Sequence, residues 1–378
     1  MSEKKKTGFE ALAKSELYPQ EQLMPVKKSK RSFFIGLPRE VSLQENRISL
    51  TPDAVALLVN NGHEVLVETM AGEGSKFSDK QYSEAGAKIV YSAEEVYKAD
   101  FILKIEPPTL EELEHFRPGQ TLISALQMGN LKQECINALL KKRVTALAYE
   151  FIEDKVGSMP IVRAMSEIAG STVMLIAAEY LSTVNKGKGI ILGGITGVPP
   201  TKVVIIGAGT VAEYAARAAL SLGAEIQVFD NHLYKLRRIK HTLGHQFYTS
   251  TIDTITLSES LQNADVVIGA LRAEKGKVRH VVSEEMVKKM KPDSLIIDLS
   301  IDQGGCIETS ETTTLNRPVF RKHDIIHYCV PNVASRVATT ATTALSNIFT
   351  PTILRAAEEG GVEEMIFSHK WFMKGVYT

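Results

Sequence analysis

The residues best suited to chemistry lie in a segment that begins with an apolar run and a glycine-rich turn. The segment VVIIGAGTVAEYAARAALSLGAEIQVFD places Gly207 and Gly209 directly after that run and the small residue Ala212 shortly after them. Gly207 permits a tight turn, Gly209 leaves room for a phosphate at a helix N-terminus, and Ala212 lets the helix pack closely on the strand. This spacing predicts a dinucleotide-binding turn; the alternative is a βαβ turn with only a structural role.

An acidic residue follows this turn at the distance that nucleotide binding requires. Asp230 ends the next apolar run, 23 residues after Gly207. A carboxylate at this point accepts hydrogen bonds from the adenosine ribose hydroxyls and repels a 2′-phosphate, which favours NAD over NADP. Three basic residues follow closely and would weaken that preference: Lys235, Arg237 and Arg238.

The overall composition argues against several other classes of protein. The chain has 378 residues, of which 44% are apolar and 23% charged, and its 44 basic side chains balance 44 acidic ones. Such a chain folds into two or three globular domains of about 150 residues each, and no net field favours nucleic acid or a membrane surface. The three cysteines form no CxxC pair, so no metal site is expected. The absence of an apolar leader predicts a cytoplasmic protein.

Alternating patterns predict the elements that position these residues. From Ser32 onward short β-branched runs alternate with helical patterns, and a second such series opens at Lys202. This alternation is typical of parallel sheets covered by helices. We therefore expect an α/β fold with two Rossmann-like domains, each a mostly parallel sheet flanked by helices, and a ligand-binding cleft between them.

Two longer helical patterns connect the two series. One covers residues 166–184 and the other covers residues 333–359, and the second is expected to pack back onto the first domain. The predicted organisation is a polar N-terminal extension over 1–31, a substrate domain over 32–165 plus 339–378, and an NAD-binding domain over 166–338.

Several longer motifs resemble those of the alanine dehydrogenase and transhydrogenase NAD-binding subunit family. They are GLPREVSLQENRISLTP, NNGHEVLVETMAGEGS, ADFILKIEPP, MSEIAG, VIIGAGTVAEYAARAALSLGA, IDLSIDQGGC and HYCVPN. IDQGGC and HYCVPN are more similar to the alanine dehydrogenase version. The resemblance implies the reversible NAD-linked oxidative deamination of alanine to pyruvate and ammonia, and a homo-oligomer.

The same resemblance implies roles for two charged residues. Arg47, in ENRISLTP, matches the arginine that binds the substrate carboxylate, a task suited to its bidentate fork; the alternative is a solvated loop arginine. Asp302, in SIDQGG, matches the acid beside the nicotinamide, where it orders water or helps proton transfer. Asp298 lies earlier on the same predicted strand and is the structural alternative to Asp302.

The chain departs from the family pattern at two catalytic positions. The dehydrogenases carry a lysine two residues after Lys104, where this chain has Glu106, and a histidine where it has Gln127. Glu106 supplies the opposite charge, and Gln127 cannot titrate. Residues i and i+2 of a strand share a face, so Lys104 is the candidate to replace the missing lysine, unless it forms a salt bridge with Glu106.

The resemblance implies roles for two further residues. Each of them also has a simpler structural alternative. Ser166, in MSEIAG, would hydrogen-bond the cofactor, or else form the N-cap of the connecting helix. Asn332, in CVPN, would contact the nicotinamide ribose or carboxamide, or else cap the helix that begins at residue 333.

These observations leave two main hypotheses for function. The first is an NAD-dependent alanine dehydrogenase that acts on a small amino acid and its 2-oxo acid. The alternative is an NAD(H)-binding or transhydrogenase-subunit-like protein without dehydrogenase activity, because the lysine and histidine are replaced. An amino-acid dehydrogenase with a different substrate lies between them, since Glu106 could receive an amine.

Overall fold

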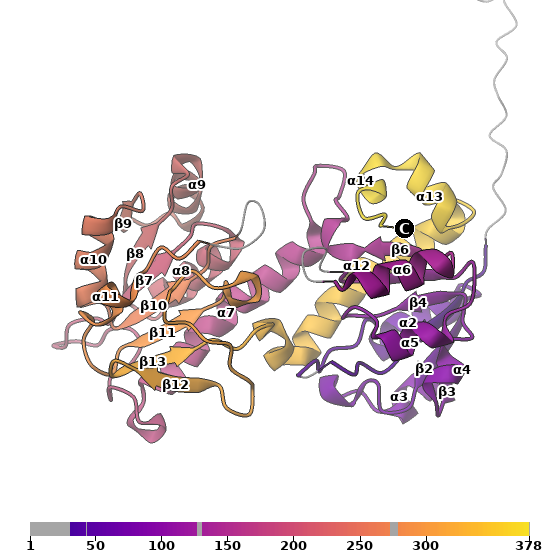
Figure 1. Ribbon diagram of the computed structural model, residues 1–378, viewed down its shortest axis with the longest axis horizontal. Helices are drawn as coiled ribbons and strands as arrows, with labels where there is room; N and C mark the ends of the chain where they lie inside the picture. Colours follow the sequence, from indigo (N-terminus) through magenta and orange to yellow (C-terminus); the bar gives the residue numbers. More distant parts are fainter. Residues whose placement is uncertain (1–30, 43, 127–130, 273–278, 378) are drawn as a thin grey trace, which may run out of the picture.

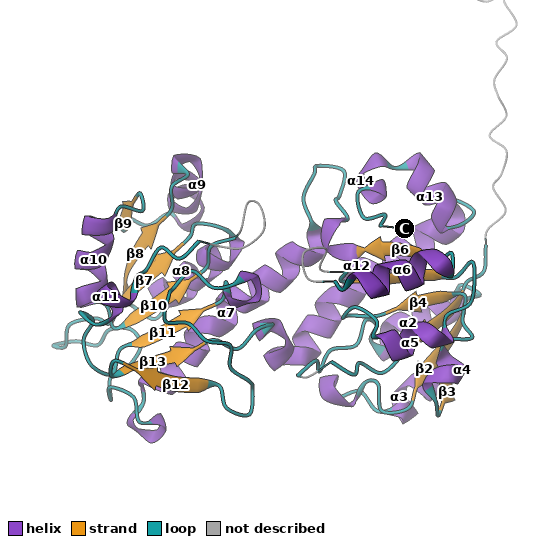
Figure 2. Cartoon of the chain, viewed as in Figure 1, coloured by secondary structure: helices purple, strands orange, loops and turns teal. Residues whose placement is uncertain are grey.

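Two lobes joined by two long helices make up the computed structural model, which describes residues 31–42, 44–126, 131–272 and 279–377 (Figure 1). Both lobes consist of a central sheet with helices on its faces (Figure 2). The predicted α/β class with two Rossmann-like sheets is therefore confirmed.

The first lobe contains a six-stranded sheet in which every described pair is parallel. The strand order is β3-β2-β1-β4-β5-β6. The strands are β1 (Phe34–Leu37), β2 (Glu64–Glu68), β3 (Lys88–Val90), β4 (Phe101–Leu103), β5 (Thr121–Ser124) and β6 (Thr145–Ala148), and the helices are α2 (Pro52–Asn60), α3 (Asp79–Glu84), α4 (Ala93–Val96), α5 (Leu110–His115) and α6 (Gln133–Lys141). The strands read as nearly continuous apolar runs because helices cover both faces of a parallel sheet.

The second lobe contains a seven-stranded sheet in the order β12-β13-β11-β10-β7-β8-β9. The strands are β7 (Lys202–Ile206), β8 (Glu225–Phe229), β9 (Tyr248–Ser250), β10 (Val266–Gly269), β11 (Leu295–Asp298), β12 (Val319–Lys322) and β13 (Ile325–Tyr328), and the helices are α8 (Thr210–Ser221), α9 (Leu233–Leu243), α10 (Thr254–Asn263) and α11 (Glu284–Val287). Only the β12–β13 pair is antiparallel among the described strands. The strand order reverses between β7 and β10, which is where open α/β sheets bind ligands.

Helix α7 (Pro160–Leu181) connects the lobes. It begins six residues before the predicted start at Ser166, because Pro160 occupies the first turn, where a proline costs no hydrogen bond. Ile161 belongs to the core of the first lobe and Val173 to that of the second. By length and composition α7 could cross a membrane. The core helix of a soluble protein meets the same criteria, and α7 packs against α8 and α12.

Helix α12 (Ala338–Glu358) returns the chain to the first lobe, after a 3-10 turn over Val333–Val337. Its residues Leu345, Phe349 and Ile353 lie in the first lobe's core. The short helices α13 (Val362–Ser368) and α14 (Lys370–Met373) follow, and Val376 pairs with Leu147 of β6. The C-terminal segments therefore pack on the first lobe.

Candidate active site at the junction of the lobes

The glycine turn after β7 has the geometry of a phosphate-binding loop. Gly207 has a φ of +115°, and a Cβ there would lie 2.4 Å from the carbonyl oxygen of Ala270, so only glycine fits. Gly209 is the N-cap of α8, and apart from its chain neighbours no atom of the described residues lies within 4 Å of the place where its Cβ would be. Ala212 is buried in the first turn of that helix. The open space therefore lies directly beside the helix N-terminus.

The carboxylate of Asp230 is fixed at the edge of this turn. Asp230 follows β8 and is buried; its Oδ2 accepts the amide of Ala208 at 2.8 Å and its Oδ1 that of His232 at 2.8 Å. The turn, the free α8 N-terminus and this carboxylate fit the pyrophosphate and adenosine ribose of NAD. Among the described residues, no group of three or more His, Cys, Asp or Glu side chains could hold a metal ion.

Arg47 lies in the loop after β1, where the two lobes meet. It is buried, and its guanidinium forms two hydrogen bonds with Glu45, from Nε at 2.7 Å and from Nη2 at 2.5 Å. Burial opposes ionisation of Glu45, but Arg47 outweighs it and lowers the pKa of the Glu45 carboxyl. The alternative of a solvated loop arginine is therefore wrong.

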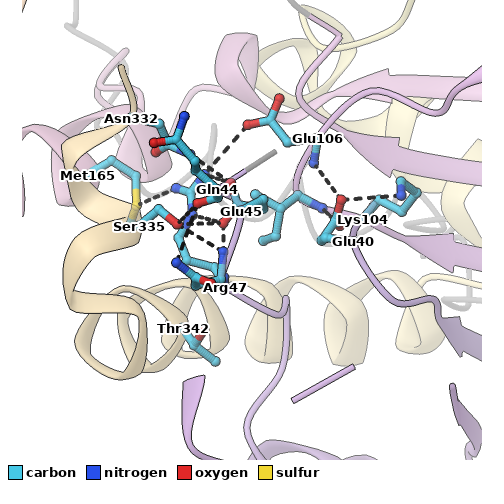
Figure 3. Close-up of polar contacts among 12 residues, drawn as sticks. Glu40, Gln44, Glu45, Arg47, Lys104, Glu106, Met165, Asn332, Ser335 and Thr342 are labelled. Atoms are coloured by element: carbon cyan, nitrogen blue, oxygen red, sulfur yellow. Dashed lines mark hydrogen bonds and ion pairs between the residues drawn. The ribbon is translucent and has the colours of Figure 1, made fainter. Parts of the chain in front are cut away.

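The outer edge of the same guanidinium faces two other groups. Nη1 lies 3.3 Å from the thioether sulfur of Met165 in α7, a weak acceptor, and Nη2 lies 3.8 Å from Oε1 of Glu106 (Figure 3). Burial, with the negative charge of Glu45, raises the pKa of Glu106 to about 7. A carboxyl that titrates near neutral pH thus lies beside the predicted carboxylate-binding arginine.

Residues of the second lobe complete this cluster. The side-chain amide of Asn332 donates to Glu45 at 2.7 Å, and its backbone amide hydrogen-bonds Asp302. The Asp302 side chain stays accessible to solvent at the edge of the cluster; partial desolvation raises the pKa of its carboxyl, and the positive charge of Arg47 opposes that shift. Asn332 is the N-cap residue of the following 3-10 turn, but its side chain forms no capping hydrogen bond. The sequence-predicted Arg47, Glu106, Asp302 and Asn332 therefore meet in one place.

Asp298 has a different environment. Its carboxylate accepts hydrogen bonds from the amides of Ser300 (3.0 Å) and Cys306 (2.9 Å) and from the hydroxyl of Ser310 (2.8 Å). These hydrogen bonds hold the loop that carries Asp302. Asp298 therefore has the structural role that the sequence suggested as its alternative to Asp302.

Lys104 is buried away from Arg47. Its Nζ lies 2.6 Å from Glu112. It also lies 3.2 Å from Glu40 (Figure 3), so the lysine pairs with these two carboxylates and not with Glu106. Burial would lower the pKa of Lys104, but these two carboxylates together raise it. Glu40 also accepts the backbone amide of Ile105 at 2.6 Å. The lysine is held in its charged form inside the first lobe.

Comparisons with known proteins show the family to which the chain belongs. The family model described as alanine dehydrogenase/PNT, N-terminal domain, matches residues 36–169, and the C-terminal domain model matches residues 173–378. The chain belongs to the alanine dehydrogenase/PNT family. Alanine dehydrogenase of Bacillus subtilis is 40% identical over 332 residues, 88% of this chain and 87% of that protein. Alanine dehydrogenase of Mycolicibacterium smegmatis is 39% identical over 327 residues, 86% of this chain and 88% of that protein.

Solved structures of the same family superpose on both lobes. An L-alanine dehydrogenase matches with a TM-score of 0.85 and 33% identity, covering 91% of this chain and 94% of that chain. A transhydrogenase from Sinorhizobium meliloti matches with a TM-score of 0.76 and 25% identity, covering 86% and 94%. The alanine dehydrogenase/PNT relationship confirms the resemblance found in the motifs, and with it the NAD-dependent class of the protein.

The remaining predicted site residues are Gln127 and Ser166. Gln127 lies outside the described residues. Ser166 lies in the second turn of α7, so the prediction that it forms the N-cap of that helix is wrong; its contact with the cofactor stays a prediction.

Sequence reasoning missed three neighbours of Arg47: Glu45, Tyr149 and Met165. Of these, only Glu45 had a signal, because it lies two residues before Arg47 in the same family motif.

Proposed function

We propose that this protein catalyses the reversible NAD-dependent oxidative deamination of L-alanine to pyruvate and ammonia. The observation that carries the proposal is the meeting of Arg47, Asp302 and Asn332 at the junction of the lobes, within a chain of the alanine dehydrogenase/PNT family. Bound NAD supplies the hydride acceptor for the substrate carbon.

The chain's own residues would bind the substrate and handle protons. Arg47 would hold the carboxylate at its outer edge, because Glu45 occupies the other edge. Asp302, whose pKa is raised by partial desolvation, would exchange a proton with the substrate nitrogen or with water. Asn332 would contact the nicotinamide half of the cofactor, and the turn at Gly207 and Gly209 its pyrophosphate.

One set of observations favours the second function, an NAD(H)-binding protein without dehydrogenase activity. Glu106 stands where the dehydrogenases have a lysine, and Lys104 is held by Glu40 and Glu112. General acid–base catalysis typically contributes about 10²- to 10⁴-fold to a rate, so a site without those groups would be slow by that factor.

One assay separates the two functions. NADH consumption is measured with pyruvate and ammonia, then with a panel of 2-oxo acids, beside a fluorescence titration of NADH binding. Turnover with pyruvate is the expected result. Tight NADH binding with no turnover on any acid would instead establish the binding function.

We also propose that the protein is cytoplasmic and, as the family resemblance implies, that it forms a homo-oligomer. Light scattering after size exclusion measures the second point directly, and a monomer would contradict it.

A further inference from the structure

The outer edge of the Arg47 guanidinium can serve only one carboxylate at a time. Glu45 takes Nε and one hydrogen of Nη2, which leaves Nη1 and the second Nη2 hydrogen for a bidentate partner. Glu106 Oε1 already lies 3.8 Å from Nη2 on that side, and the opposite position is held by the weakly accepting sulfur of Met165. A substrate carboxylate would therefore bind where Glu106 interacts.

We propose that Glu106 competes with the substrate carboxylate for Arg47, so that carboxylate binding is coupled to the uptake of one proton by the Glu45–Glu106 pair. This inference rests on the proposed role of Arg47 in substrate binding, and it deepens that role by making Glu106 a specificity-determining residue. The proton comes from solvent and forms an O–H bond on the carboxyl pair; no other bond changes.

Among the charged groups of this cluster, Glu106 is the one whose protonation state must change when an anion binds. Glu45 and Glu40 act on it as negative charges, and Arg47 is the cation that acts on it. Tyr149 lies in the 3-10 turn Tyr149–Phe151, which follows β6. It feels the charges of Glu106 and Arg47, and burial keeps its hydroxyl protonated by raising its pKa.

The remaining charged groups near this cluster are already balanced or point elsewhere. Asp302, on the second lobe, is accessible to solvent and feels the positive charge of Arg47, and Lys104 is neutralised by Glu112 and Glu40. An incoming anion would thus add a negative charge to a buried cluster in which Glu45 is held ionised by two hydrogen bonds from the Arg47 side chain. Protonation of the Glu45–Glu106 pair removes that excess charge.

The sign of the pH effect follows from this arrangement. Glu106 has a pKa of about 7, so it is protonated below that pH and ionised above it. Ionised Glu106 both repels the anion and occupies Arg47. The affinity for a simple carboxylate should therefore fall as pH rises, by up to about tenfold per pH unit above 7.

The test is calorimetry on the NADH-saturated protein with pyruvate as the probe and without ammonia, in two buffers of different ionisation enthalpy. The wild type should take up about 0.9 proton per pyruvate at pH 8 and about 0.1 at pH 6, given a pKa near 7. Glu106→Gln should take up close to none at either pH and should bind pyruvate with a pH-independent affinity. Glu106→Lys, which restores the family's charge, should behave in the same way.

Glu84→Gln is the matched control, because Glu84 is exposed and its one ion pair within the described part of the chain is a surface pair with Lys80. It should reproduce the wild-type proton uptake. Thermal unfolding and NADH titration establish that each variant is folded, and Glu106→Lys decides the question if Glu106→Gln is not.

Each outcome is decisive. Binding without proton uptake, or uptake that persists without Glu106, overturns the proposal. If pyruvate binds only after Glu106 is replaced, the result supports the proposal. If pyruvate binds neither to the wild type nor to the variants, the result overturns it. Proton-coupled binding without turnover leaves this inference standing and refutes the dehydrogenase function instead.

Discussion

The close approach of α7 to α8 gives the sharpest test of how the lobes are held together. Gly170 in α7 lies against α8, and a Cβ at this position would be 2.4 Å from the carbonyl oxygen of Val211 and 2.8 Å from Cβ of Tyr214. The first distance is about 1 Å short of the roughly 3.5 Å at which nonbonded heavy atoms attract each other. Because the oxygen belongs to the backbone, Gly170→Ala must push the two helices apart.

The expected change in the free energy of unfolding of Gly170→Ala follows from two opposing effects. Replacing glycine by alanine inside an exposed helix stabilises a protein by about 1 kcal/mol. Overpacking a tight contact costs about 1–3 kcal/mol, and the short distance to a rigid backbone atom places this site at the upper end. The net loss should be about 2 kcal/mol, roughly a 30-fold shift of the unfolding equilibrium.

Urea denaturation measures this loss, and an NADH titration measures its functional effect. NADH affinity should weaken, because Val211 is in the first turn of α8, whose N-terminus is the proposed binding site of the cofactor pyrophosphate. Ser171→Ala, at an exposed neighbouring position of α7, is the control and should change stability by less than about 0.5 kcal/mol. A gain of stability in Gly170→Ala, with unchanged NADH affinity, would refute the close packing of the two helices.

Four other outcomes follow from the site. Arg47→Ala should raise the KM for pyruvate about 10- to 100-fold, the value of a lost charged hydrogen bond, and an unchanged KM would remove Arg47 from the substrate site. Asp302→Asn should lower kcat about 10²- to 10⁴-fold in the same assay if Asp302 transfers protons. Lys104→Met should reduce the free energy of unfolding by about 3–5 kcal/mol because it strands two buried carboxylates; wild-type stability in urea would contradict this pairing. Asp230→Ala should weaken NADH binding about tenfold, and calorimetry measures this.

Local patterns predicted the fold well because each strand and turn carries its own signal. The run before Gly207 and the acidic residue at 230 lie within one βαβ unit, so their spacing alone indicates the cofactor turn. The start of α7 was placed too late because Ser166 resembles an N-cap, whereas Pro160 was the better signal.

The partners of charged residues were harder to predict. Lys104 was expected to face the same side as Glu106, yet its neighbours come from the loop after β1 and from α5. No local spacing encodes such pairs, because they depend on how loops pack across a sheet edge. The pairing of Glu45 with Arg47 was missed although the two residues are neighbours, since a loop has no fixed periodicity from which to infer it.

The C-terminal helices have a consequence for biosynthesis. The first lobe's sheet ends at β6, against which Val376 pairs, and its core contains Leu345, Phe349 and Phe372. During translation the second lobe is therefore complete before the first, although the first is synthesised earlier. A truncated chain that ends before residue 340 should expose the apolar surface of its N-terminal half to chaperones, although it contains all the strands of its nucleotide-binding half.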